Sequence, residues 1–176
     1  NHSILLTFFS PSGYEVHKNY NGADFVFYLP MDSAGNARKF LKITNPSIAI
    51  FVKYEFWYNH LKCARRKGAK IYGVSSLFRP SHRFFKWYGG FFRKALRLFD
   101  HFYAQDQRSK DLLNSIGIDQ VTVTGDTRYD RMLAVKERST ENEIIRSFVE
   151  EKPVLILGSS WTIDEEILVP ALFELR

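Results

Sequence analysis

Residues 48–75 read IAIFVKYEFWYNHLKCARRKGAKIYGVS and contain a predicted strand, helix and second strand in close succession. The apolar runs Ile48–Lys53 and Lys70–Ser75 are typical of strands buried on both faces of a parallel sheet. Between them, Glu55–Lys67 predicts a helix, because its last turn is basic and Gly68 supplies a C-terminal cap. This strand–helix–strand unit decides the fold class.

The same alternation continues in both directions along the chain. Further strands are predicted at Ile4–Phe9, Asp24–Leu29, Phe99–Ala104, Gln120–Thr124 and Val154–Leu157. Further helices are predicted at Asn36–Thr44, Ser109–Ile116, Asp130–Glu151 and Asp164–Arg176. We therefore expect an α/β fold, with a Rossmann-like parallel sheet flanked by helices and joined by right-handed crossovers.

The predicted elements divide the chain into three parts. Residues 1–125 form the Rossmann-like domain, 126–152 a connecting helix and linker, and 153–176 the beginning of a second α/β domain. The chain opens without the basic and apolar regions of a signal peptide, and no apolar run is long enough to span a membrane. Because the pattern starts and stops abruptly, we expect both ends to be cuts through a longer protein.

Composition excludes several classes of protein. With 45% apolar and 25% charged residues the chain can build a core, and its one cysteine excludes a disulfide scaffold. Lys and Arg number 25 against 19 Asp and Glu, and 16% of the residues are aromatic. The histidines are scattered, and only His60 and Cys63 lie close together, so we predict no metal site and no cofactor.

Four polar turns each follow a predicted strand, at the edge where open α/β sheets bind ligands. They are Ser10–Glu15, Lys53–Trp57, Thr124–Asp130 and Gly158–Trp161. Backbone N–H groups and hydroxyls in the first and last of these turns suit an anion, although a plain turn with a serine N-cap fits as well.

The charged residues of the two central turns also allow two interpretations. Glu55 stands among aromatic residues as a site acid would, or else it is a first-turn helix residue that complements the dipole. Arg128 can act as a fork for a phosphate or carboxylate, whereas Asp126 or Thr127 can simply cap the following helix.

Residues 78–99 form the most unusual segment by composition. They include no acidic residue and interleave Arg and Lys with aromatic rings at partly helical spacing, which Gly89-Gly90 weakens or kinks. Three interpretations remain open: an amphipathic core helix, a nucleic-acid surface, or a membrane surface that meets anionic headgroups. The residues expected to face lipid in the last case are Arg83, Lys86, Trp87, Phe91, Phe92, Arg93 and Lys94.

Taken in order, these motifs resemble the bacterial 3-deoxy-D-manno-octulosonic acid (Kdo) transferases of lipid A glycosylation. The matching segments are Thr7–Glu15, Tyr28–Asp32, Tyr54–Trp57, Val121–Asp130 and Gly158–Trp161. Each segment is a weak signal alone, but five in the right order and spacing are specific. The amino-acid sequence of the first segment is similar to that of the Bacteroidetes branch of this family.

The resemblance implies the N-terminal half of a two-domain GT-B glycosyltransferase and the start of its second domain. Such an enzyme transfers Kdo from CMP-Kdo to a lipid A precursor, inverts the anomeric carbon and needs no metal. It works on the cytoplasmic face of the inner membrane, to which an N-terminal anchor holds it. Its general base is a Glu in a Gly-Glu motif upstream of the first strand, so we expect this chain to be soluble and inactive by itself.

The resemblance also implies roles for particular residues. Glu55 and Arg128 are assigned to catalysis, although relatives often have Lys at the second position and Pro where Tyr58 stands. The acceptor-side candidates are Ser10, Ser12, Gly13 and Arg79, and the donor-side candidates are Ser159, Ser160 and Trp161. Residues 1–125 are thereby expected to bind the acceptor, and the domain that begins at 153 the donor.

A second hypothesis belongs to a different class of protein. Residues 78–99 would then make the chain a non-catalytic peripheral module that binds anionic lipid or nucleic acid. We expect no nucleic-acid partner if the transferase resemblance holds, and the motifs do not predict an oligomeric state.

Overall fold

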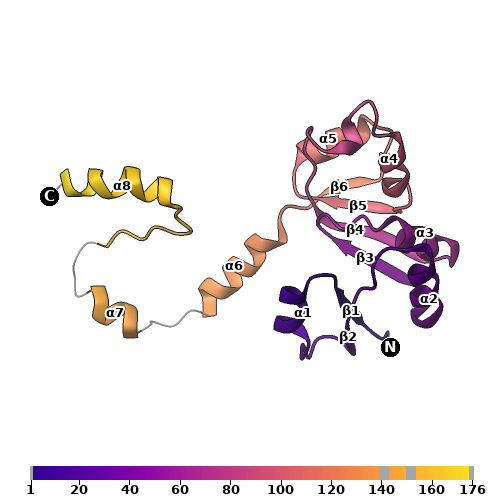
Figure 1. Cartoon of the computed structure of the whole chain (residues 1–176), viewed down its shortest axis with the longest axis horizontal. Coiled ribbons are helices and arrows are strands. Elements are labelled where there is room, and N and C mark those ends of the chain that lie inside the picture. The colour runs from indigo at the N-terminus through magenta and orange to yellow at the C-terminus, as the bar shows by residue number, and fades with distance from the viewer. Residues whose placement is uncertain (1, 139–142, 150–153, 175–176) are drawn as a thin grey trace. The chain divides into compact units, whose positions relative to one another are not determined.

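A computed structural model describes residues 2–138, 143–149 and 154–174 (Figure 1). Its strands are β1 (Leu5–Phe8), β2 (Phe25–Tyr28), β3 (Ile48–Val52), β4 (Lys70–Ser76), β5 (His101–Ala104) and β6 (Val121–Val123). Its helices are α1 (Pro11–His17), α2 (Ala34–Thr44), α3 (Tyr58–Arg66), the 3₁₀ turn η1 (Arg83–Phe85), α4 (Gly90–Leu96), α5 (Gln107–Asn114), α6 (Thr127–Arg138), α7 (Glu143–Val149) and α8 (Thr162–Glu174). The predicted α/β fold, with parallel strands flanked by helices, is confirmed.

The strands form two parallel sheets rather than one. β3, β4, β5 and β6 lie side by side in chain order, and β1 pairs with β2 from Leu5 opposite Phe25 to Phe8 opposite Tyr28. In the four-stranded sheet, Ile48 lies opposite Lys70 and Phe102 opposite Val121. Because all neighbours are parallel, the carboxyl ends of β3 to β6 meet at one edge, which carries the polar turns that follow β3 and β6.

One predicted strand is wrong. Val154–Leu157 has no strand structure, and Val154, Leu155 and Ile156 are exposed by 43%, 60% and 79%. The run was predicted from its apolar residues alone, but a strand also needs a neighbour to satisfy its backbone N–H and C=O groups. No described strand pairs with it, so hydrophobicity without a partner does not produce a strand here.

Helix boundaries also differ from the prediction, most clearly for the helices that follow β3 and β6. The helix after β3 begins at Tyr58 rather than Glu55, so the segment with Glu55 is a loop. The helix predicted over Asp130–Glu151 is described as α6 and α7, and the residues between them lie outside the described ranges. The two glycines predicted to close the helices at Gly68 and Gly117 do have left-handed backbone, with φ of 82° and 77°, although α3 ends at Arg66 and α5 at Asn114.

The core of the four-stranded sheet is largely aromatic. Phe78, Phe99 and Phe102 are each at most 8% exposed, and the rings of Phe99 and Phe102 stack at 4.5 Å. Leu61 of α3 and Leu113 of α5 are fully buried among the same cluster. Burying each large apolar side chain contributes roughly 1.5–3 kcal/mol, so this cluster is the main source of stability in this part of the chain.

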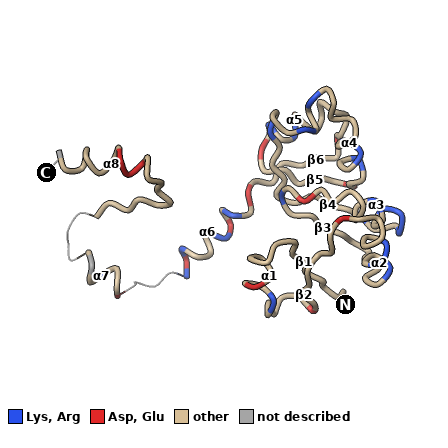
Figure 2. The backbone as a smooth tube through the Cα atoms, in the orientation of Figure 1, with Lys and Arg blue, Asp and Glu red and all other residues tan. Residues whose placement is uncertain are grey.

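The chain forms two compact units, Asn1–Arg131 and Met132–Arg176. The first contains both sheets, and the second contains α7, α8 and the end of α6. The proposed division into an acceptor domain, a linker and a donor domain stays a prediction. Figure 2 shows basic residues along α3, α4 and α5 and mixed charges along α6.

Asp100 joins three elements at the start of β5. Its carboxylate accepts hydrogen bonds from the Ile71 N–H at 2.8 Å and the Arg65 guanidinium at 2.7 Å, and Lys70 Nζ lies at 3.4 Å. Burial by itself raises the pKa of Asp100, but these hydrogen bonds and charges outweigh it and hold the pKa below its ordinary value. The ionised carboxylate therefore favours the folded state.

We expect Asp100→Ala to lower the free energy of unfolding by about 2 kcal/mol at neutral pH. An unfolded Asp titrates near pH ~3.9, so wild type loses this contribution as the pH falls from there through the lower native pKa. Urea titrations of both proteins between about pH 7 and pH 2.5 check this. A difference that stayed constant over the whole range would contradict the assigned role.

Candidate functional site

A contact between two aromatic rings connects the carboxyl end of β1 to that of β3. The ring of Phe9, just after β1, lies 4.5 Å from the ring of Trp57, which follows β3. This contact joins the Ser10–Gly13 turn to the loop with Glu55. Two motifs more than 40 residues apart therefore lie at one place, as expected for a site at the sheet edge.

The Ser10–Gly13 turn is stabilised by its own hydroxyls. Ser10 Oγ is the N-cap of α1, accepts a hydrogen bond from the Gly13 N–H at 3.3 Å and lies 3.0 Å from Ser12 Oγ. A Cβ on Gly13 would lie 2.8 Å from the Phe8 ring, which explains the glycine. The simpler interpretation, a capped turn, is therefore present, and both exposed serines remain available to a ligand.

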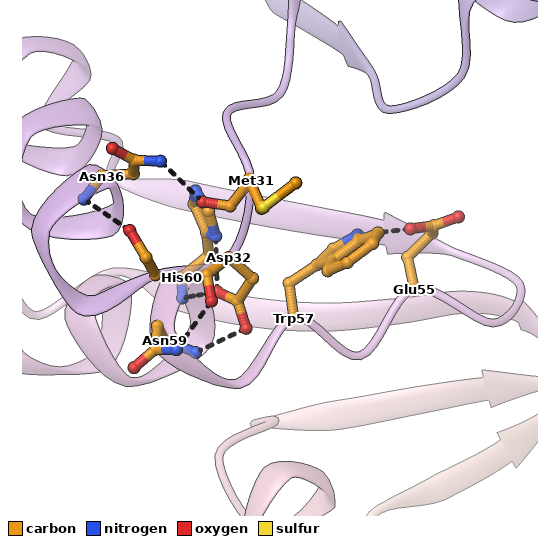
Figure 3. Close-up of polar contacts among 8 residues, drawn as sticks. Met31, Asp32, Asn36, Glu55, Trp57, Asn59 and His60 are labelled. Atoms are coloured by element: carbon orange, nitrogen blue, oxygen red, sulfur yellow. Dashed lines mark hydrogen bonds and ion pairs between the residues drawn. The ribbon is translucent and has the colours of Figure 1, made fainter.

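Glu55 lies in the loop between β3 and α3 (Figure 3). It is not a first-turn helix residue, since α3 begins three residues later. The Trp57 indole N–H donates a hydrogen bond to Glu55 Oε2, and the carboxylate is otherwise exposed. This contact orients Glu55 at the sheet edge through Oε2, and the residue as a whole is exposed.

The start of α3 is capped by a residue from another part of the chain, Asp32 (Figure 3). Its carboxylate accepts hydrogen bonds from the backbone N–H groups of Asn59 at 3.2 Å and His60 at 3.0 Å. Asp32 Oδ1 also lies 2.7 Å from Nδ1 of the buried His60 ring. Because Trp57, the N-cap residue, makes no side-chain cap bond, Asp32 supplies what the local sequence lacks.

Arg128 is held by a neighbouring carboxylate at the start of α6. Its Nε donates to Asp126 Oδ2 at 2.8 Å, and its backbone N–H donates to Asp126 Oδ1 at 3.0 Å. These contacts with Arg128, assisted by the charge of Lys53, hold the pKa of Asp126 below its ordinary value. The Arg128 side chain is still 65% exposed. Asp126 therefore caps the helix as predicted and also orients a cation that can reach a ligand.

The chain after β6 crosses back over the sheet edge. Thr127 Oγ1 lies 3.3 Å from Ser75 Oγ at the end of β4, and Gln105 Nε2 donates to the Ser75 carbonyl at 2.9 Å. Lys53 and Ser75 both have left-handed backbone, with φ of 62° and 53°. Non-glycine residues seldom adopt this conformation, and such residues concentrate at functional sites. The crossing places Arg128 near the ends of β3 and β4 instead of at the far edge beyond β6.

The basic aromatic segment 78–99 divides into core and surface. Phe84 is buried, whereas Trp87 and Phe91 are 93% and 61% exposed. Phe84 and Phe91 lie in η1 and α4, which a bend at residues 86–89 separates, so the segment is not one helix. The core and surface interpretations therefore each account for part of the segment.

The predicted lipid-facing residues also differ among themselves. Arg83 and Lys94 are exposed, and Lys86 and Phe92 are partly buried. The guanidinium of Arg93 donates to the carbonyls of Phe84 at 2.8 Å and Lys86 at 2.9 Å. Arg93 thus stabilises the bend between η1 and α4 rather than presenting a free cation.

Gly89 allows that bend to form. A Cβ at this position would lie 2.3, 2.7 and 2.9 Å from the carbonyl oxygens of Arg83, Phe84 and Lys86, whereas one at Gly90 would meet nothing within 4 Å. We expect Gly89→Ala to lower the free energy of unfolding by about 2 kcal/mol. Gly90→Ala is the matched control, and it should leave stability unchanged or raise it by about 0.5 kcal/mol. Equal effects of the two variants in urea denaturation would refute the steric account.

The remaining acceptor candidate, Arg79, lies beside Tyr54 and His82. His82 Nδ1 accepts a hydrogen bond from the Arg79 N–H at 3.0 Å, and the rings of Tyr54 and His82 pack edge to face at 4.5 Å. Burial first, and the charge of Arg79 second, lower the pKa of His82. Burial raises the pKa of Tyr54 to about 12. Both side chains are therefore neutral at physiological pH.

The donor candidates lie in the second compact unit. Ser160 Oγ donates to Glu165 Oε1 at 2.7 Å, and the Trp161 N–H donates to Asp164 Oδ2 at 3.0 Å. The serine hydroxyl and backbone N–H predicted to suit a phosphate therefore face carboxylates. Ser159, at φ 59°, makes the turn before them.

Sequence reasoning missed several residues that build this region. Asp32 entered only as part of a motif, and His60 only as a scattered histidine, because their contact spans 28 residues. A signal for Asp32 was available, since residues 53–58 include no Ser, Thr, Asp or Asn, and the helix therefore needed a capping group from elsewhere. Among residues 2–138, 143–149 and 154–174, no group of three His, Cys, Asp or Glu side chains is placed to hold a metal.

Comparison with known proteins identifies the family. Residues 1–131 match the family described as 3-deoxy-D-manno-octulosonic-acid transferase (kdotransferase). This chain belongs to the Kdo transferase family. The family is one of glycosyltransferases, and the match includes both sheets, Glu55 and Arg128.

Several curated Kdo transferases are similar to this chain. The Bordetella pertussis enzyme is 29% identical over 150 residues, which cover 85% of this chain and 35% of that enzyme. The Rickettsia prowazekii enzyme is 27% identical over 154 residues, or 85% of this chain and 32% of that enzyme. For the Chlamydophila psittaci enzyme the identity is 25% over 178 residues, or 98% and 41%. The chain thus spans about a third of the length of the first two relatives.

A solved structure supports the GT-B-like architecture. The UDP-GlcNAc 2-epimerase from Methanocaldococcus jannaschii superposes with a TM-score of 0.60 at 17% identity, over 99% of this chain and 54% of the epimerase chain. At this identity the likeness shows the fold alone. In the described part of the Kdo transferase chain, no helix is long and apolar enough to cross a membrane.

Proposed function

We propose that this chain is the acceptor-side portion of an enzyme that transfers Kdo from CMP-Kdo to a lipid A precursor. The observation that carries the proposal is the family match over residues 1–131. The geometry supports it, because the family's motifs at Ser10–Gly13, Glu55 and Arg128 all lie at the carboxyl edges of parallel strands.

The proposed reaction is a displacement at the anomeric carbon. A hydroxyl oxygen of the acceptor forms the new bond to that carbon as the bond to the CMP phosphate oxygen breaks, which inverts its configuration. A general base takes the hydroxyl proton, and CMP departs with the bonding electrons. No bound metal is part of this proposal, so protein cations must stabilise the charge that develops on the phosphate or the Kdo carboxylate.

Arg128 is proposed to supply that cation. Its guanidinium is oriented by Asp126 and exposed by 65%, and Lys53 adds a second positive charge nearby. Glu55, oriented by Trp57, is proposed to accept a hydrogen bond from the acceptor sugar. The Ser10–Gly13 turn lies next to Trp57, because the ring of Phe9, just before the turn, contacts the Trp57 ring. We propose that the hydroxyls and N–H groups of this turn bind the acceptor opposite Glu55.

The general base is proposed to lie outside this chain, in the family's Gly-Glu motif, since no Gly-Glu dipeptide occurs in residues 1–176. The test compares the complete enzyme with the 176-residue chain, using CMP-Kdo and a lipid A precursor, with the product followed by mass spectrometry. We expect transfer by the complete enzyme only. Absence of transfer by the complete enzyme would overturn the proposed reaction, and turnover by the 176-residue chain would overturn the placement of the base.

We further propose that the exposed part of segment 78–99 contacts the anionic cytoplasmic face of the inner membrane. Trp87, Tyr88 and Phe91 are at least 53% exposed, and Arg83 and Lys94 are exposed in the same segment. Flotation with phosphatidylglycerol vesicles over a salt series tests this. Binding of RNA or DNA in preference to these vesicles would instead favour a nucleic-acid module.

A further inference from the structure

An aromatic hollow of about 590 Å³ lies beside Glu55 in the first compact unit. One wall comes from the loop between β3 and α3, with Tyr54, Phe56 and Trp57. The other wall comes from η1 and α4, with Phe84, Phe91 and Phe92. Its size is that of a site for a small organic ligand or one part of a larger one.

The lining of this aromatic hollow is suited to hydrocarbon. The rings of Phe56 and Phe84 pack edge to face at 5.2 Å, and those of Tyr58 and Phe91 lie 5.8 Å apart. His82 and Tyr54 are both neutral, so neither brings a charge into the hollow. Water therefore gains few hydrogen bonds there, and an apolar chain that displaces it is favoured.

Among the residues that line the hollow, the charged side chain is positive. Arg83 lines the hollow, and its guanidinium carbon lies 5.6 Å from the centre of the Phe92 ring. Arg79 acts electrostatically on both Tyr54 and His82. No Asp or Glu is among the lining residues. The ligand that complements this arrangement has an apolar tail and an anionic group near the rim.

We propose that the aromatic hollow binds one acyl chain of the lipid acceptor, with an acceptor phosphate at Arg83 and Arg79. This inference rests on the proposed function, which makes the acceptor an acylated, phosphorylated sugar. Tyr54 and Phe56 both line the hollow, and Glu55 lies between them in the sequence. A chain anchored there brings the attached sugar to Glu55.

The first experiment measures binding of hexyl, octyl and decyl phosphate to the 176-residue chain by calorimetry, below their micelle concentrations. Each buried methylene is worth about a fourfold gain in affinity, so affinity should rise by about that factor per added methylene until the hollow is full. Inorganic phosphate and decanol are the two further probes. If inorganic phosphate bound as tightly as decyl phosphate, the hollow would not be a binding site for an acyl chain. If decanol bound as tightly as decyl phosphate, Arg83 and Arg79 would have no role in binding a phosphate.

Two exposed phenylalanines provide a matched pair of variants. Phe91 lines the hollow and is 61% exposed, whereas Phe27 of β2 does not line it and is 57% exposed. We expect Phe91→Ala to weaken decyl phosphate binding about tenfold and Phe27→Ala to leave it unchanged. Equal losses in both variants would indicate general surface adhesion and overturn the proposal.

A filling variant tests the hollow directly. Ala95 of α4 is a buried residue of the lining, so Ala95→Leu should reduce affinity for decyl phosphate more than for hexyl phosphate, with circular dichroism confirming the fold. If the complete enzyme transfers Kdo but no alkyl phosphate binds, the hollow is not an acyl site and the proposed function stands. If alkyl phosphates bind as expected and no Kdo is transferred, the proposed function fails and the binding site stands.

Discussion

Replacing Asp32 by alanine is expected to lower the free energy of unfolding by about 3 kcal/mol. The variant removes the acceptor for the N–H groups of Asn59 and His60 and the partner of the buried His60 ring. His60 Nε2 already lacks a hydrogen-bond partner among the described residues, so loss of Asp32 leaves both ring nitrogens unpaired. Urea denaturation of the 176-residue chain measures the effect.

Asp111→Ala is the matched control, since its carboxylate accepts a hydrogen bond from the exposed Gln107 within one helix. It should cost no more than about 0.5 kcal/mol. Asp32→Asn retains one oxygen acceptor and should fall between the two. If Asp32→Ala were as mild as Asp111→Ala, α3 would not depend on this cap, and the position of Trp57 and Glu55 would need another explanation.

Replacing Arg128 by alanine in the complete enzyme is expected to reduce kcat by about 10²–10³-fold. A cation that stabilises charge only as the bond to CMP breaks contributes mainly to kcat and little to the KM for CMP-Kdo. Arg128→Lys should recover part of the rate because it keeps the positive charge. The recovery should be incomplete because Lys cannot make the paired contact of the Arg128 Nε and Nη2 atoms with Asp126. Steady-state kinetics of the variants check both statements.

Arg131 provides the control on the same helix, since it is an exposed Arg of α6. Arg131→Ala should change kcat less than about twofold. Asp126→Asn should fall between wild type and Arg128→Ala, because Arg128 keeps its charge but loses the carboxylate that orients it. A rise in KM with kcat unchanged in Arg128→Ala would show that this residue binds the donor without acting in the transition state.

Most of the strands could be predicted because their signal is local. β3 and β4 were expected at Ile48–Lys53 and Lys70–Ser75 and are found at Ile48–Val52 and Lys70–Ser76. Continuous apolar runs bounded by turns specify buried parallel strands when neighbouring strands exist. Val154–Leu157 had the same local signal and failed, since no described strand pairs with it.

The candidate site could be predicted only in part. The motifs located Ser10, Glu55 and Arg128 after strands, and each is found at a carboxyl edge. The contacts that orient them were not predictable. The contact of Phe9 with Trp57 and that of Thr127 with Ser75 join residues 48 and 52 positions apart, respectively.

The sequence by itself determined the α/β class, the order of the elements and the family, because periodicity, glycine caps and motif order are properties of the linear chain. Only the tertiary structure decided that Asp32 caps α3 and that segment 78–99 is divided between core and surface. It also showed that Gly89 and Arg93 form a bend beside the aromatic hollow. These features depend on hydrogen bonds and packing between distant residues, which exist only once the chain has folded.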